Sequence, residues 1–224
     1  MKKFVNQLVA ELEAHANADQ ALQMEAYMKG HFPFYGIKSV LRRQILFRVW
    51  NASNQQMLRR DWQLVVANLW QKDQREYQYV AMDLMRKIEK QLREADLPFI
   101  EKLILDKSWW DTVDFLASHC IGIILLKDEK LRRTTADRYM KSNKLWLQRT
   151  ALIFQLMYKE NTDEDLLFTM VDAIHGSKEF FINKGAGWAL RQYSKINPES
   201  VRKYIDLQES KLSGLTLREA SKYL

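Results

Sequence analysis

The chain has 224 residues, of which 47% are hydrophobic and 12% aromatic, so it can form a full hydrophobic core and is not expected to be disordered. Only 7 Gly and 3 Pro supply turns, which favours an almost wholly helical protein over a sheet-rich one. Lys and Arg outnumber Asp and Glu by 35 to 28, and the resulting charge of +7 favours an anionic partner.

The N-terminal part predicts a helical hairpin followed by a turn. Apolar residues recur at helical spacing over residues 4–12, and Asp19 is expected to cap a second helix. Residues 31–37 form an aromatic turn with Pro and Gly as breakers, and Ser39 is expected to cap the next helix. We therefore expect residues 1–52 to cap one end of a helical array.

From about Gln56 onward the sequence reads as a series of helix pairs with a weak internal repeat. Small or branched apolar residues stand at comparable points of successive second helices, at separations of 32, 38 and 35: Ala81, Val113, Ala151 and Ala186. This spacing is typical of stacked HEAT-type hairpins, which curve into a solenoid with a concave face. We expect an all-α superhelix that makes residues 1–224 a single domain with a concave basic face; a non-repetitive helical bundle is the alternative.

The stretch from Lys107 to Asp114 places two tryptophans beside two carboxylates where a helix is expected to begin, with Ser108 as its N-cap. Trp110 and Asp114 are four residues apart and so share one face of that helix. An indole ring and a carboxylate presented together can both stabilise a developing cation. Asp111, directly after the helix start, is better explained as a complement to the helix dipole.

Other polar and aromatic residues fall near the repeat positions and would meet Asp114 on the concave side: Gln148, Arg149, Lys184 and Arg191, with Trp146 and Trp188. Arg149 could form an ion pair with Asp111 or Asp114, or could clamp a phosphate. Gly185 and Gly187 precede Trp188 inside a helix, where each costs about 1 kcal/mol relative to Ala. They indicate either tight helix packing or the close approach of a ligand.

Several other classes of site are not expected. Cys120 is the single cysteine, which excludes an internal disulfide and favours a reducing cytoplasm. No apolar run follows Lys2 and Lys3, and no segment reaches the length of a membrane span. The four histidines lack metal-ligand spacing, so we expect no metal and no cofactor. Gly-rich phosphate loops and Gly-x-Ser-x-Gly motifs are absent, which argues against nucleotide hydrolysis and acyl transfer.

Several long motifs together resemble those of one family. They are Lys107–Asp114, Trp146-Leu147-Gln148-Arg149, Ser177–Ile182 and Gly187-Trp188-Ala189-Leu190-Arg191, with Tyr27-Met28-Lys29 and His31-Phe32 nearer the N-terminus. They strongly resemble the AlkD-like DNA alkylation repair glycosylases, which are built from HEAT-like repeats. The resemblance covers nearly the whole chain.

The resemblance implies a monofunctional hydrolase that cleaves the N-glycosidic bond of cationic N3- or N7-alkylated purines in duplex DNA, in base excision repair. It implies catalytic roles for Asp114, Trp110 and Trp188. It implies that Arg149 holds a backbone phosphate. It also implies that Tyr27, Ser39 and Arg43 lie on the DNA-binding face. Arg191 is expected to bind DNA as well. Val40 stands where the family commonly has Pro, which puts in doubt only the contact at that helix start.

Two functions therefore follow from the sequence. The first is an alkylpurine DNA glycosylase that acts as a monomer on double-stranded DNA in the cytoplasm and only on bases that already carry positive charge. The second is a non-catalytic HEAT-like scaffold that binds DNA or protein. A carboxylate that faces phosphates favours the enzyme, since a scaffold has no evident use for it.

Overall fold

The computed structural model describes residues 2–224 and contains only helices, turns and loops over that range, which confirms the predicted all-α class. The chain forms two compact units, one extending to Glu89 and the other running from Lys90 to Leu224. Within the described residues, no helix combines the length and the apolar character that a bilayer crossing requires. The expectation of a single domain stays a prediction.

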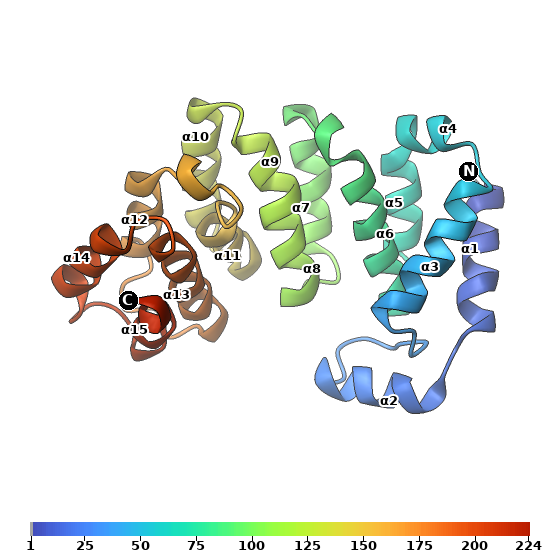
Figure 1. The fold of residues 1–224 in the computed structure, drawn as a ribbon, viewed down its shortest axis with the longest axis horizontal. Helices are drawn as coiled ribbons and strands as arrows, with labels where there is room; N and C mark the ends of the chain where they lie inside the picture. Colours follow the sequence, from blue (N-terminus) through green and yellow to red (C-terminus); the bar gives the residue numbers. More distant parts are fainter. Residues whose placement is uncertain (1) are drawn as a thin grey trace. The chain divides into compact units, whose positions relative to one another are not determined.

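The first unit is made of helices packed in pairs (Figure 1). Its helices are α1 (Lys2–Ala14), α2 (Ala18–Tyr27), α3 (Ser39–Asn51), α4 (Gln55–Arg60), α5 (Trp62–Trp70) and α6 (Arg75–Ile88). Helix α1 packs on α3, and α5 packs on α6. The apolar stripe of α1 is fully buried at Leu8 and Leu12, as the helical spacing predicts.

The second unit repeats this pairing and contains the stretch with the paired tryptophans. Its helices are α7 (Leu97–Leu105), α8 (Trp110–Phe115), α9 (Gly122–Leu125), α10 (Glu129–Met140), α11 (Leu145–Ile153), α12 (Glu164–Asp172), α13 (Phe180–Ser194), α14 (Pro198–Gln208) and α15 (Gly214–Ala220). Helix α11 packs against α10 and α13, and α13 packs against α15. A π-helical segment, Leu116–Ile121, joins α8 and α9 into one continuous helix (Figure 1).

The four predicted repeat positions are all buried within helices. Ala81, Val113, Ala151 and Ala186 lie on α6, α8, α11 and α13, and each is at most 2% exposed. Small apolar side chains there allow each second helix to approach its neighbours closely. The helical repeats predicted from their spacing are therefore present.

Three predicted helix starts are wrong. Asn17 rather than Asp19 caps α2, by accepting the Gln20 N–H. Ser39 is the first residue of α3, after an extended Lys38. Trp109 rather than Ser108 precedes α8, because the Ser108 hydroxyl donates instead to the Ile104 carbonyl at the end of α7. Only α2 has a side-chain cap, from Asn17, whereas Lys38 before α3 and Trp109 before α8 make no side-chain capping hydrogen bond.

The aromatic turn between α2 and α3 is held by one buried carboxylate. Glu76 on α6 is fully buried and accepts the backbone N–H groups of Tyr35, Gly36 and Ile37 at 2.9–3.0 Å. Gly36 has a φ of 85°, and a Cβ there would lie 2.1 Å from the Asn17 carbonyl oxygen. Only glycine fits this point. The turn fixes the positions of Tyr27 and Ser39 at the neighbouring helix ends.

We expect Glu76→Gln to destabilise the first unit by about 2–4 kcal/mol, because an amide accepts with one oxygen and turns its NH₂ group toward backbone N–H donors. Denaturant unfolding and hydrogen exchange at the Tyr35–Ile37 amides would measure this. Glu13→Gln is the matched control, since Glu13 touches the same turn only through the Tyr35 hydroxyl at 3.3 Å. Equal stability of both variants would contradict the role given to Glu76.

Candidate active site

Asp114 lies on the last turn of α8, immediately before the π-helical segment. The preceding residues Thr112 and Val113 are buried, and their packing fixes the orientation of the helix that carries Asp114. The Ser118 hydroxyl donates to the Asp114 carbonyl at 2.7 Å, inside the segment where the regular helical hydrogen bonds are interrupted. π-Helical insertions of this kind often accompany functional sites.

Arg149 on α11 binds Asp114 through both carboxylate oxygens. Its Nε donates to Oδ1 at 2.7 Å and its Nη2 donates to Oδ2 at 2.8 Å. The third nitrogen, Nη1, donates to the Phe181 carbonyl at 2.6 Å. Arg149 is only 3% exposed, whereas the Asp114 side chain keeps 16% of its surface accessible. Of the alternatives for Arg149, the structure therefore shows the ion pair with Asp114.

Burial raises the pKa of Asp114, because the charged form loses hydration. The hydrogen bonds and the positive charge of Arg149 lower it, and the negative charge of Asp111 raises it further. Asp114 is therefore an acid whose charge depends on Arg149.

A cluster of three aromatic rings lies next to Arg149. The ring centroids of Trp109, Trp146 and Phe181 lie 5.1–5.8 Å from one another, and the guanidinium carbon of Arg149 lies 5.9 Å from the Phe181 ring centroid. Such edge and tilted contacts are favourable for aromatic pairs. Arg149, which lies beside this cluster, is nearly fully buried.

Asp114 also lines a recess of about 380 Å³. Eight side chains line it: Trp110, Asp114, Arg149, Phe180, Phe181, Lys184, Trp188 and Arg191. The structure thus brings together the three predicted catalytic residues, Asp114, Trp110 and Trp188, with Arg149 and Arg191. Sequence reasoning did not single out Phe180 and Phe181, although both lie within one of the motifs that carry the family resemblance.

The predicted DNA contacts Tyr27, Ser39 and Arg43 lie in the first unit, so the recess does not include them. Tyr27 is 72% exposed at the end of α2, and Ser39 is exposed at the start of α3. The Arg43 side chain is two-thirds exposed and donates to Asp83 at 3.3 Å, while the buried Arg42 binds the same carboxylate. Their roles in DNA binding stay predictions.

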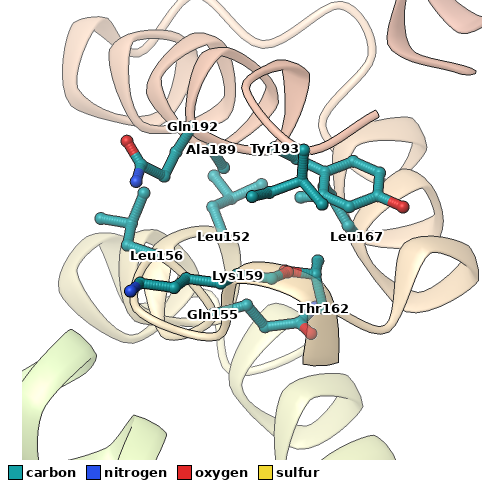
Figure 2. A pocket seen from close by; sticks show the side chains of 10 residues that line it. Leu152, Gln155, Leu156, Lys159, Thr162, Leu167, Ala189, Gln192 and Tyr193 are labelled. Atoms are coloured by element: carbon teal, nitrogen blue, oxygen red, sulfur yellow. The ribbon is translucent and has the colours of Figure 1, made fainter. Parts of the chain in front are cut away.

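A second cavity in this unit is a packing feature. It lies between α11, α13 and the chain leading into α12, and Figure 2 shows Leu152, Leu156, Leu167 and Ala189 turned toward it. Its volume is about 10 Å³, about the minimum that holds one water molecule. The recess beside Asp114 is therefore the better candidate for a substrate. In the described part of the chain, no cluster of His, Cys, Asp and Glu has the geometry of a metal site.

A second charged cluster adjoins the recess. Glu219 on α15 accepts hydrogen bonds from Lys184 at 2.6 Å, Arg191 at 2.7 Å and Lys222 at 2.8 Å. The hydrogen bonds from Lys184 and Lys222 lower the pKa of Glu219 to about 2. The cluster of three cations and one carboxylate has a net charge of two positive units. Two of its cations, Lys184 and Arg191, line the recess.

The two glycines of α13 serve helix packing. A Cβ on Gly187 would lie 2.6 Å from the Glu219 Cβ and 2.8 Å from the Thr216 carbonyl oxygen, so α15 could not pack where it does. A Cβ on Gly185 would lie 3.2 Å from Arg149 Nη1. Gly187 therefore admits α15, and Gly185 leaves room for the guanidinium that holds Asp114.

Comparisons with known proteins show which family and which solved structures the chain is similar to. The family model described as "DNA alkylation repair enzyme" matches residues 8–224. A solved structure described as a predicted DNA alkylation repair enzyme from Enterococcus faecalis is 33% identical, covers 93% of this chain and 96% of its own, and has a TM-score of 0.82.

Two structures from Streptococcus mutans share the fold at lower identity. They are smu.31 and AlkD2, each 19% identical over 82% of this chain, with a TM-score of 0.57. The matched part covers 91% of the first and 88% of the second. A comparison with curated proteins found no match.

We expect Gly187→Ala to destabilise the second unit by about 1–3 kcal/mol, because the new methyl group overlaps the backbone of α15. Thermal unfolding would measure the loss. Gly214→Ala is the matched control, since a methyl group there would meet nothing within 4 Å and Ala favours the first turn of α15. An unchanged melting temperature for Gly187→Ala would show that α15 does not depend on this close approach.

Proposed function

The chain belongs to the DNA alkylation repair enzyme family, and from this premise we propose that it is a monofunctional DNA glycosylase that excises cationic N3- and N7-alkylated purines from duplex DNA. The family membership itself supports a role in DNA repair. The observation that carries the finer proposal is the Asp114 carboxylate, held by Arg149 in an open recess beside Trp110 and Trp188.

The proposed reaction does not require a general acid to protonate the leaving base. In an alkylated purine the base already carries positive charge, so it leaves as a neutral molecule when the C1′–N bond breaks and takes the bonding electron pair. The sugar becomes an oxocarbenium-like cation, a water oxygen then bonds to C1′, and the water releases a proton. One carboxylate can stabilise the cation and orient the water.

The residues of the recess fit these tasks. Asp114 supplies the negative charge, and the faces of Trp110 and Trp188 add attraction for a cation through the ring quadrupole. The phosphate contact expected of Arg149 stays a prediction. Because all three of its terminal nitrogens already donate within the described protein, its geometry favours orienting Asp114 and keeping it ionised.

The partner in this proposal is double-stranded DNA that carries alkylated purines. The excess of basic residues and the cations of the recess suit a polyanion. Action as a monomer in the cytoplasm is part of the same proposal.

We expect Asp114→Asn to lower the release of N7-methylguanine from methylated duplex DNA by roughly 100-fold or more, because the amide carries no charge to stabilise the cation. Single-turnover release would be measured with wild-type protein, Asp114→Asn and Asp111→Asn. Asp111 lies on the same helix but does not line the recess, so its variant should stay close to wild type.

Equal release by wild type and Asp114→Asn would remove Asp114 from the mechanism. Salt-dependent DNA binding with no release at all would favour the non-catalytic scaffold. A uracil-containing duplex serves as the negative substrate, and its efficient cleavage would contradict a restriction to cationic bases.

The pH dependence of release should report Asp114. Because burial raises the pKa of this carboxyl, it takes up a proton at a higher pH than an ordinary aspartate, whose pKa is about 3.9. After subtraction of the uncatalysed reaction, the rate should fall with decreasing pH before that value is reached. Asp111→Asn should move this fall to lower pH, since the Asp111 charge contributes to the raised pKa. A rate that is flat down to about pH 4 would contradict the assignment.

A further inference from the structure

Resting on the proposed function, we infer that Glu219 on the C-terminal helix α15 is a positioning residue that fixes Lys184 and Arg191 as a phosphate-binding pair in the recess wall. Lys184 and Arg191 both line the recess with Asp114. Each is tied to a different oxygen of Glu219, at 2.6 and 2.7 Å. The Glu219 side chain is only 6% exposed, so it does not itself face a ligand.

The tie leaves donors of both cations available. Arg191 uses only Nη1 on Glu219, and in the described residues its Nε and Nη2 bond to nothing else. Lys184 uses one N–H of its ammonium group on Glu219 and keeps 38% of its side-chain surface accessible. The guanidinium and the ammonium group can therefore each donate to an oxygen of a ligand in the recess.

The electrostatics of the recess require such cations. A DNA strand that brings a sugar to Asp114 also brings the phosphates on either side of it, and these repel the carboxylate. Arg149 cannot offset this repulsion alone, because its charge is already committed to Asp114. Lys184 and Arg191 supply the missing positive charge. Their hydrogen bonds to Glu219 restrict both long side chains before DNA binds, so less side-chain entropy is lost on binding.

The repeat supports this assignment. Asp114, Arg149, Lys184 and Glu219 follow one another at intervals of 35 residues on α8, α11, α13 and α15. The first two form one ion pair and the last two form another, with the order of the charges reversed. In the first pair both side chains line the recess, and the acid is the more exposed of the two. In the second pair the base faces the recess and the acid is buried.

If Glu219 positions the two cations, or if it only neutralises them, replacing it should change the affinity for DNA in opposite directions. If Glu219 only reduced the positive charge, Glu219→Gln would tighten DNA binding and steepen its salt dependence. If Glu219 positions the cations, the same variant should weaken binding to a duplex with an abasic-site analogue by roughly five- to tenfold at about 0.1 M salt. The slope of log K against log salt should become shallower by about 1, the contribution of one phosphate contact.

Fluorescence anisotropy at several salt concentrations would measure both quantities. Glu101→Gln is the matched control, because Glu101 likewise binds a neighbouring repeat through Arg138 and Tyr139 but does not line the recess. It should lose comparable stability with no change in slope. In a Lys184→Met background, Glu219→Gln should have less effect than in wild type, since one of the two cations that it positions is gone.

Tighter or unchanged binding by Glu219→Gln, a full effect in the Lys184→Met background, or an equal change of slope in Glu101→Gln would each overturn the inference. So would a wild-type protein that binds no duplex. Because binding is measured without base release, a protein that binds the analogue but excises nothing would refute the proposed glycosylase and leave this test intact.

Discussion

The ion pair between Asp114 and Arg149 is the interaction on which the candidate site depends. Both groups give up much of their hydration, and three directed hydrogen bonds from Arg149, with the nearby Phe181 ring, replace the water. Removing either partner of such a pair leaves an uncompensated buried charge, at a cost of about 3–5 kcal/mol. The backbone at Phe181 and the missing side chain at Gly185 are therefore part of the site, although neither carries a charge.

The helical repeat explains how these groups come together. Cross-helix contacts recur at nearly constant sequence separation: 37 residues for Arg138 with Glu101, 35 for Arg149 with Asp114 and for Lys184 with Glu219, and 32 for Tyr204 with Asp172. Each joins one helix pair to the next. The ion pairs that join the repeats of the second unit thus also place charged side chains at intervals of 35 residues, in the order acid, base, base, acid: Asp114, Arg149, Lys184 and Glu219. Three of these four side chains line the recess.

The sequence predicted the helical class and the repeat because both depend on local spacing, and the buried Ala81, Val113, Ala151 and Ala186 bear this out. It predicted Asp114, Trp110 and Trp188 as neighbours through the family resemblance. The partner of Arg149 stayed open, because a long side chain can reach either of two carboxylates and only packing selects one. Glu219 was missed because α15 carries no motif, and its nearness to Lys184 depends on the approach that Gly187 permits.

A buried ion pair is weak evidence for stability, since well-packed apolar residues of similar volume often stabilise a core as well or better. The ion pair of Asp114 and Arg149 is therefore weaker evidence of a stabilising role than the buried apolar residues at the repeat positions Val113 and Ala151. An ion pair that served only to hold repeats together would be expected to bury its acid fully, as Glu219 is buried. Asp114 instead keeps part of its surface exposed on the recess that Trp110 and Trp188 also line, while burial raises its pKa and disfavours its charge. Its placement therefore costs stability locally, and such costs are expected where a side chain must meet a substrate.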